Sequence, residues 1–168
     1  MIAFIDIDGV VADARRRRER MLALHGNKRD DAAWATFHEG AEKDPVIPGG
    51  FLLVRGLMES QVDVFFLTAR AESQRSVTAH WLAANGLGDY EHLIMRPHGD
   101  RRPGVEFKTE IVKREVADLP SIYYINDCRP TVIAVDDDPR ITAAYDALKM
   151  GIYTMTIGGY SDKGINAL

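Results

Sequence analysis

The first eleven residues constrain the fold of this chain more than any other stretch. Residues 2–5 are all apolar, and the acidic pair Asp6 and Asp8 follows directly, before Gly9. A short apolar run of this kind is typical of a strand buried on both faces of a sheet. Side chains alternate along a strand, so Asp6 and Asp8 would point the same way, and Gly9 indicates that the chain turns there. We therefore expect both carboxylates to face a pocket at the carboxyl edge of a parallel sheet. The alternative is a strand that ends in an ordinary Asp-Gly turn.

The composition is that of one ordinary globular domain, which we expect to span residues 1–168. Hydrophobic residues make up 46% of the chain, enough to bury a core at this length. The net charge of −4 argues against general coating of nucleic acid, although a local basic face remains open. Cys128 is the single cysteine, which excludes an internal disulfide and a zinc site built on several cysteines. No stretch resembles a membrane span or a signal peptide, so we expect a cytoplasmic protein; the oligomeric state stays open.

The rest of the chain alternates between strand and helix patterns. Alternation of this kind, with largely apolar strands, predicts an α/β fold in which helices cover both faces of a parallel sheet. We therefore expect a three-layer, doubly wound domain. After the first strand, the patterns predict strands at 62–67, 92–95, 131–135 and 152–157, and helices at 51–60, 72–85, 107–117 and 141–150.

Residues 12–48 are more than a strand-to-helix connection requires. They predict a helix over 12–26 and a second helix that Asp30 or Asp31 caps and that continues to about Glu42. We interpret this stretch as a small helical insert over the pocket, not as a separate domain. Trp34 and Phe37 stand three positions apart on one side of the second helix, and we interpret them as interior contacts of the insert; platforms for base stacking are the alternative.

The first of these helices carries four consecutive arginines at 15–18, followed by Arg20. Consecutive residues spread around the whole circumference of a helix, so these arginines cannot all face one ligand. Arg15 and Arg18 share one face, and Arg16 shares another with Arg20. A solvated helix surface is one interpretation, and a basic rim for a polyanionic substrate is the other.

Polar residues follow the predicted strands in a fixed order, and this order carries a resemblance. Asp6-Ile7-Asp8-Gly9-Val10 resembles the first motif of the haloacid dehalogenase superfamily of phosphotransferases, in which an apolar strand is followed by Asp-x-Asp. The further motifs of that superfamily then match in sequence. They are Thr68 after the second strand, Lys108 near the start of a helix, and the pair Asp136 and Asp137 after the fourth strand. The resemblance covers nearly the whole chain and implies a Rossmann-like fold.

The resemblance implies a phosphatase and assigns roles to four residues. Asp6 would be the nucleophile that forms an aspartyl-phosphate, and Asp8 would protonate the leaving group and later activate water. Thr68 would donate a hydrogen bond to a phosphate oxygen. Lys108 would neutralise another phosphate oxygen while balancing the acids.

The resemblance also implies a magnesium site. The ligands would be Asp6, the backbone carbonyl of Asp8, and Asp136, with Asp137 as a ligand or next to one. Magnesium prefers hard oxygen ligands, which these residues supply. Asp138 is open between a third ligand and a helix cap, and we favour the cap because Pro139 follows.

A narrower resemblance comes from the middle of the chain. Residues 67–70 (Leu-Thr-Ala-Arg), 95–102 and Lys108 are similar to the 3′-phosphatase domain of polynucleotide kinase/phosphatase. The family's substrate-binding arginines match Arg70 and Arg96, and the resemblance implies a role in nucleic-acid repair. The sequence departs from the complete family enzyme because no phosphate-binding Gly-x-x-x-x-Gly-Lys motif of a kinase is present. Asp138 stands where these relatives often have an arginine.

The leading hypothesis is a magnesium-dependent phosphatase that acts on the 3′-phosphate of a nucleic acid or on a nucleotide. A phosphatase for small molecules is the second hypothesis, with the insert as its specificity element. A phospho-receiver signalling domain is the third, since it also uses an aspartate, paired acids, threonine and lysine. The order disfavours it, because a receiver's phosphoacceptor follows a later strand, where this chain offers only Asp63 at a strand's start.

Overall fold

The computed structural model describes residues 1–28, 30–88, 92–119 and 130–157. Five strands form one sheet in the order β3-β2-β1-β4-β5, and each neighbouring pair runs parallel. This is the α/β architecture with a parallel sheet that the sequence predicts, and β1 lies at its centre. The strands are β1 (Ile2–Ile5), β2 (Asp63–Ala71), β3 (Leu93–Arg96), β4 (Val132–Asp136) and β5 (Ile152–Thr156).

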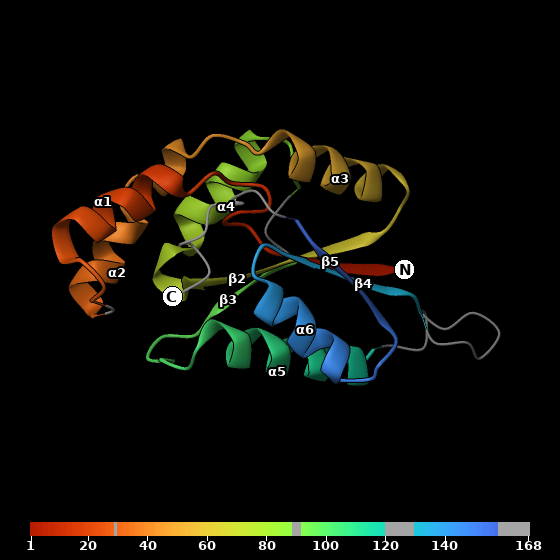
Figure 1. Cartoon of the computed structure of the whole chain (residues 1–168). Helices are drawn as coiled ribbons and strands as arrows, with labels where there is room; N and C mark the ends of the chain where they lie inside the picture. Colours follow the sequence, from red (N-terminus) through yellow and green to blue (C-terminus); the bar gives the residue numbers. More distant parts are fainter. Residues whose placement is uncertain (29, 89–91, 120–129, 158–168) are drawn as a thin grey trace.

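Helices cover both faces of the sheet (Figure 1). Helices α3 (Pro48–Glu59) and α4 (Arg75–Ala84) pack on one face, and α5 (Gly104–Ala117) and α6 (Pro139–Ala147) pack on the other. A short 3-10 helix, η2 (Glu72–Gln74), precedes α4. The three layers are therefore those of a doubly wound fold. None of the helices in the described ranges is long and apolar enough to cross a membrane.

Strand β1 is buried along its whole length because it contributes to both cores. Ala3 and Ile5 belong to the core under α3 and α4, whereas Ile2 and Phe4 belong to the core under α5 and α6. This division follows from the alternation of side chains along a strand. Burial of each large side chain contributes about 1.5 to 3 kcal/mol, so the central strand anchors the residues that follow it.

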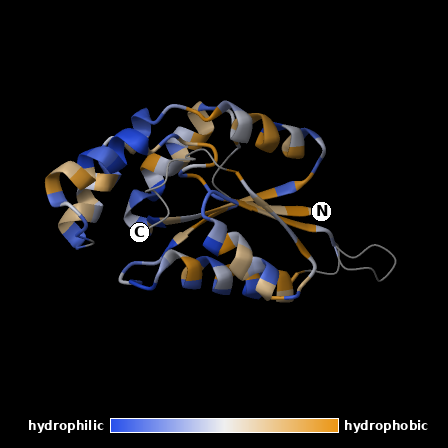
Figure 2. Ribbon diagram, in the orientation of Figure 1, coloured by the Kyte–Doolittle hydropathy of each residue, from blue (hydrophilic) through white to orange (hydrophobic). Residues whose placement is uncertain are grey.

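The insert lies at the end of the sheet opposite the N-terminus of β1 (Figure 1). It consists of α1 (Arg15–His25), α2 (Asp31–His38) and the 3-10 helix η1 (Ala41–Lys43). Helix α1 is largely hydrophilic, in contrast to the strands (Figure 2). Asp30 caps α2 by accepting a hydrogen bond of 2.9 Å from the backbone N–H of Ala33.

Several sequence-based expectations about the elements are corrected. Helix α3 begins at Pro48, not at 51, since proline is favoured at the first helical position. Helix α2 ends at His38, not near Glu42, because Gly40 adopts a left-handed conformation with φ of 81°. Strand β2 continues to Ala71, where it pairs with Arg96, so residues 68–70 lie within the strand and not after it. Helix α5 begins at Gly104, directly after Pro103, instead of at 107.

The interpretation of Trp34 as an interior contact is also wrong. Its side chain lies on α2 with 42% of its surface exposed. Phe37, three residues later, is half-buried. The helix period correctly places the two residues on the same side of α2, but it does not show whether that side faces the protein interior or solvent.

The contact of α3 with the turn after β1 generates a stability prediction. A Cβ added to Gly50 would lie 1.8 Å from the backbone oxygen of Val10, whereas a Cβ on Gly49 would meet nothing within 4 Å. Gly50→Ala should therefore lower the free energy of unfolding by about 1 to 3 kcal/mol, the usual cost of overpacking. Gly49→Ala, in the same helix, should leave it unchanged or slightly higher. Urea denaturation measures both, and equal stability of the two variants would contradict the tight contact.

Candidate active site

A cluster of three carboxylates and one lysine, buried except for the half-buried Asp137, lies at the carboxyl ends of β1 and β4. Asp6 follows β1, Asp136 ends β4, and Asp137 comes next in the chain. One oxygen of each of these carboxylates lies within 4.8 Å of the others. Lys108 reaches the cluster from α5, and its Nζ lies 2.8 Å from Asp6 Oδ1 and 2.7 Å from Asp136 Oδ2. The structure therefore brings these four sequence-predicted residues together.

The electrostatics of this cluster show an excess of negative charge. Burial raises the pKa of Asp6 well above its ordinary value, although the charge of Lys108 opposes the rise. Burial and the neighbouring Asp136 raise the pKa of Asp137 to about 7. Burial alone would lower the pKa of Lys108, but the charges of Asp136 and Asp6 raise it, so the lysine stays protonated. One ammonium group faces three carboxylates, and a divalent cation would relieve the remaining repulsion.

The donor set fits a hard cation such as Mg²⁺. Asp6, Asp136 and Asp137 offer only carboxylate oxygens, and Asp6 and Asp136 are almost fully buried. The second oxygen of Asp136, Oδ1, accepts a hydrogen bond of 3.0 Å from the backbone N–H of Asp138, which fixes the carboxylate. The Asp138 side chain caps α6 by accepting from the N–H of Arg140, as the sequence favoured.

Gly9 determines how closely the first and fourth strand ends approach. Its φ is 89°, a left-handed conformation, so the chain turns there as predicted. A Cβ at this position would lie 2.3 Å from Oδ2 of Asp137. Only glycine therefore allows Asp137 to come this near to the turn after β1.

The carboxylate of Asp8 points to a second cluster, formed by two arginines and another acid. Arg70 donates to both Asp8 oxygens, with Nε at 2.9 Å and Nη2 at 2.6 Å. Arg17 donates from Nη2 to Asp8 Oδ1 at 2.7 Å. Asp44 joins the cluster by accepting from Nε of Arg17 at 2.8 Å and lies 3.4 Å from Nη2 of Arg70. Asp8 is thus the point where the sheet and the insert meet.

These contacts decide the charge of Asp8. Burial would raise its pKa, but the charge and hydrogen bonds of Arg70 and the charge of Arg17 outweigh burial and hold the pKa far below its usual range. Asp8 is therefore ionised at neutral pH in this arrangement. An ionised carboxylate can accept a proton from water, whereas donating one requires a change in its surroundings.

The sequence analysis missed Arg17 and Asp44. Arg17 stands inside the arginine run, where the sequence drew attention to Arg15 and Arg18 instead. The signal that could have identified it is its spacing to Met21, because these two residues, four apart, are the buried residues of α1. Arg15 is exposed and pairs with Asp13.

The remaining predicted site residues lie along β2 and β3. Thr68 is buried in β2, and its hydroxyl accepts a hydrogen bond of 3.2 Å from the N–H of Arg70. Arg96 stacks over the ring of Phe107 and donates to the carbonyls of Ala69 and Arg102, at 3.2 and 2.7 Å. Arg96 therefore fixes the loop that follows β3.

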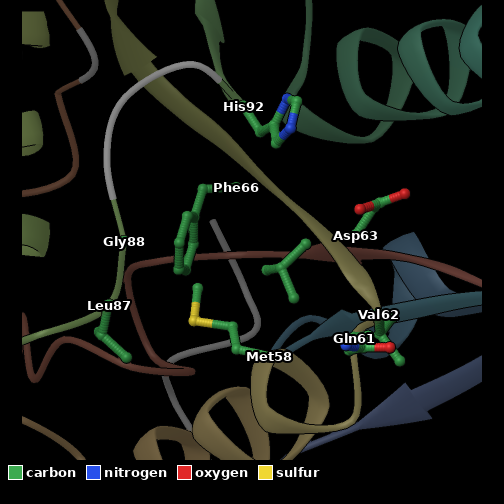
Figure 3. Close-up of a pocket in the computed structure, with 9 residues that line it drawn as sticks. Met58, Gln61, Val62, Asp63, Phe66, Leu87, Gly88 and His92 are labelled. Atoms are coloured by element: carbon green, nitrogen blue, oxygen red, sulfur yellow. The ribbon is translucent and has the colours of Figure 1, made fainter.

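A separate cavity of about 410 Å³ lies at the other end of β2 (Figure 3). It is bounded by the amino-terminal half of this strand, the C-terminal part of α3 with the residues that follow it, and residues between α4 and β3. The catalytic candidates lie at the carboxyl ends of the strands, so this cavity is not part of their site. Its lining residues are Met58, Gln61, Val62, Asp63, Val64, Phe66, Leu87, Gly88 and His92.

Solved structures share this fold at low sequence identity. A chain of the Pnkp1/Rnl/Hen1 RNA repair complex matches with a TM-score of 0.65 and 16% identity, over 93% of this chain and 42% of its own length. The class C acid phosphatase from Bacillus anthracis matches with a TM-score of 0.59 and 16% identity, over 95% and 67%. A haloacid dehalogenase hydrolase of family IA from Entamoeba histolytica matches with a TM-score of 0.61 and 10% identity, over 96% and 85%. The fold is therefore that of the haloacid dehalogenase superfamily.

The family model of the polynucleotide kinase PNKP phosphatase domain matches residues 1–144. The match includes every site residue described above, and the chain belongs to this family of phosphatase domains. It spans less than half the length of the RNA repair protein that it resembles. Comparison with curated protein sequences gave no match.

The burial of Arg17 generates a second stability prediction. Arg17→Ala leaves the buried carboxylate of Asp44 without its closest partner, which should lower the free energy of unfolding by about 3 to 5 kcal/mol. Arg16→Ala, at the neighbouring exposed position, should change it by less than about 0.5 kcal/mol. Thermal or urea unfolding of the pair measures the difference. A cost as small for Arg17 as for Arg16 would contradict the described ion-pair cluster.

Proposed function

We propose that this protein is a magnesium-dependent phosphomonoesterase that acts through an aspartyl-phosphate, on the 3′-phosphate of a polynucleotide or on a nucleotide. The observation that carries the proposal is the convergence of Asp6, Asp136 and Asp137 around Lys108 at the carboxyl edge of the sheet. Family membership supports the reaction class. The same family membership gives no support to the hypothesis of a phospho-receiver signalling domain.

In the proposed reaction, a carboxylate oxygen of Asp6 attacks phosphorus, and the bond between phosphorus and the leaving oxygen breaks. Lys108 holds Asp6 in place and neutralises part of the charge of the phosphoryl group. Thr68, within the adjacent strand β2, is suited to donate its hydroxyl proton to a phosphate oxygen. Water then attacks the phosphorus of the aspartyl-phosphate, releasing phosphate and the Asp6 carboxylate.

Asp6, Asp136 and Asp137 would hold the magnesium ion, and the backbone carbonyl of Asp8 is a further candidate ligand. When bound, the ion supplies positive charge that stabilises the transferring phosphoryl group. The three carboxylates must keep their spacing to bind the ion, and two contacts maintain that spacing. Lys108 separates Asp6 from Asp136, and the close approach of Gly9 positions Asp137.

Asp8 performs the proton transfers in the proposal. Its two arginine partners keep it ionised before substrate binds, but the same pairing weakens it as a base, so the later step in which it takes a proton from water requires these arginines to turn toward the phosphate. A phosphate dianion bound beside Asp8 raises its pKa by repulsion and competes for the same arginines. Substrate binding thereby favours uptake of a proton from solvent by Asp8, and this protonated form donates to the leaving oxygen.

Two observations bear on the substrate. The structural relative in an RNA repair complex and the family both support a polynucleotide end. In contrast, the arginines of the loop after β3 already face carboxylates, since Arg101 pairs with Asp31 and Arg102 with Asp100 and Glu110. This compensation favours the second hypothesis, a phosphatase for small molecules.

Replacing the proposed nucleophile tests the mechanism. Asp6→Asn should abolish turnover of a 3′-phosphorylated oligonucleotide while the protein remains folded, because an amide is a poor nucleophile. Asp8→Asn should reduce kcat by at least about 10²-fold. Asp63→Asn, an exposed acid at the opposite end of β2, is the matched control and should retain full activity. Near-normal turnover by Asp6→Asn would remove it as the nucleophile.

Metal removal tests the cofactor. A chelator should abolish activity, and Mg²⁺ should restore it. Ca²⁺ should restore it poorly, because its longer and more flexible coordination misplaces phosphate relative to Asp6. The measurement is the initial rate of phosphate release after metal exchange. Full activity of metal-free protein would contradict the assignment.

A further inference from the structure

Helix α2 presents a row of aromatic side chains beside the candidate site. Trp34 and Phe37 meet edge to face, with ring centres 5.8 Å apart and an interplanar angle of 88°. His38 stacks roughly parallel to Trp34, with centres 6.4 Å apart and an angle of 28°. Phe37 and His38 are half-buried, and Trp34 is the exposed member. The row therefore offers one accessible aromatic surface supported by two rings.

This aromatic row is connected to Asp8 through Arg17. The guanidinium carbon of Arg17 lies 4.5 Å from the centre of the Phe37 ring, and its Nη1 donates to the Phe37 carbonyl at 2.6 Å. The Nη2 atom of the same side chain contacts Asp8. The row therefore begins one side chain away from the group that handles the leaving oxygen.

The direction of the proposed reaction places the leaving group on this side. The attacking oxygen of Asp6 and the leaving oxygen lie roughly in line through phosphorus, and the leaving oxygen must meet Asp8. Asp8 faces the insert, not the metal cluster, because Arg17 and Arg70 hold it there. Whatever is esterified to the phosphate consequently extends toward the insert, where α2 lies.

Helix α2 is anchored near its C-terminus by the buried side chain of Arg17 and more weakly at its first residue by an exposed ion pair, which favours a fixed orientation of the aromatic row. Arg17 binds the carbonyl of Phe37 near the C-terminus, and Arg101 pairs with Asp31 at the first residue, at 3.0 Å. Eight residues of α-helix span about 12 Å, comparable to one nucleotide with its neighbour. A rigid platform of this length loses little conformational freedom when a ligand stacks on it.

The charge state of His38 suits a stacking role. Burial lowers its pKa to about 4, and the positive charges of Arg70 and Arg17 add to this against the opposing charge of Asp8. The imidazole is therefore neutral at pH 7 and acts as an aromatic ring behind Trp34, not as a cation. An exposed tryptophan on such a support also leaves apolar surface in water that a flat aromatic ligand would cover.

We propose that Trp34 stacks against the base of the terminal nucleotide whose 3′-phosphate is hydrolysed, with Phe37 and His38 as its support. This inference rests on the proposed function and assigns a specificity-determining residue to it. Stacking accepts any base, because every base has an aromatic face, so Trp34 would select nucleotides over other phosphate esters without reading sequence.

Two oligonucleotides that differ only at their 3′-phosphorylated terminus test the proposal, one with a base there and one with an abasic residue. The wild-type protein should show a kcat/KM about 5- to 100-fold higher for the terminus with a base, the range of base–aromatic stacking. Trp34→Ala should lose this preference through KM, and Trp34→Phe should keep most of it. Tyr153→Ala, which removes an exposed aromatic side chain on β5, is the control and should keep it fully. Equal kcat/KM values for both oligonucleotides with the wild-type protein would overturn the proposal while leaving the phosphatase function intact.

Tryptophan fluorescence gives a readout that requires no turnover. The chain has two tryptophans, and Trp81 is buried with 2% of its surface exposed, so quenching by a ligand reports on Trp34. In the Asp6→Asn variant, the oligonucleotide with a terminal base should quench fluorescence and the abasic one should not. Quenching without any phosphatase activity of the wild-type protein would support the stacking site and contradict the proposed reaction. Equal quenching by both oligonucleotides would overturn the stacking site.

Discussion

The ion pairs of Lys108 with Asp6 and Asp136 are the interaction on which the catalytic end of this fold depends. Parallel strands bring their carboxyl ends to one edge, and here two of those ends carry buried acids. Without a positive charge between them, the acids would repel each other in a medium of low dielectric constant. Lys108 supplies that charge from the first turns of α5, and its own burial is tolerated because both partners lie within 2.8 Å. Helix packing on one face of the sheet is thereby linked to the geometry of the site.

The site is divided into two charge clusters, one with excess negative charge and one in which two arginines balance Asp8 and Asp44. The cluster of Asp6, Asp136 and Asp137 has an excess of negative charge and suits a cation. The cluster around Asp8 contains two arginines and suits an anion that can compete for them. A phosphate ester bound between them would meet positive charge on both sides once a metal is present. The two clusters meet at the turn from Asp6 to Asp8. In the proposed reaction Asp6 attacks phosphorus and Asp8 protonates the leaving oxygen, so the two residues that act on the breaking bond are only two positions apart.

The sequence predicts the first cluster well and the second poorly, for a physical reason. Asp6, Asp136 and Lys108 follow or precede elements with strong apolar patterns, so the fold itself predicts where they meet. Arg17 and Asp44 lie in the insert, where the apolar pattern is too weak to predict which side chains turn inward. A run of arginines also hides which one turns inward, because charge alone predicts a solvated surface for all of them. Trp34 shows the same limit, since helix periodicity groups side chains but does not state what covers them.

The arrangement of Arg17 has a consequence for how such a protein can evolve. Its guanidinium group serves Asp8, Asp44 and the carbonyl of Phe37 at the same time, and Arg70 shares two of these partners. A substitution at any one of the four charged positions leaves a buried charge on another without its match. Single substitutions at these positions are therefore disfavoured, because each one destabilises the protein. The charged residues of the insert and those of the sheet depend on one another and must change together. Diversity in substrate preference has to arise elsewhere, on the exposed sides of α1 and α2, where side chains change without disturbing this set.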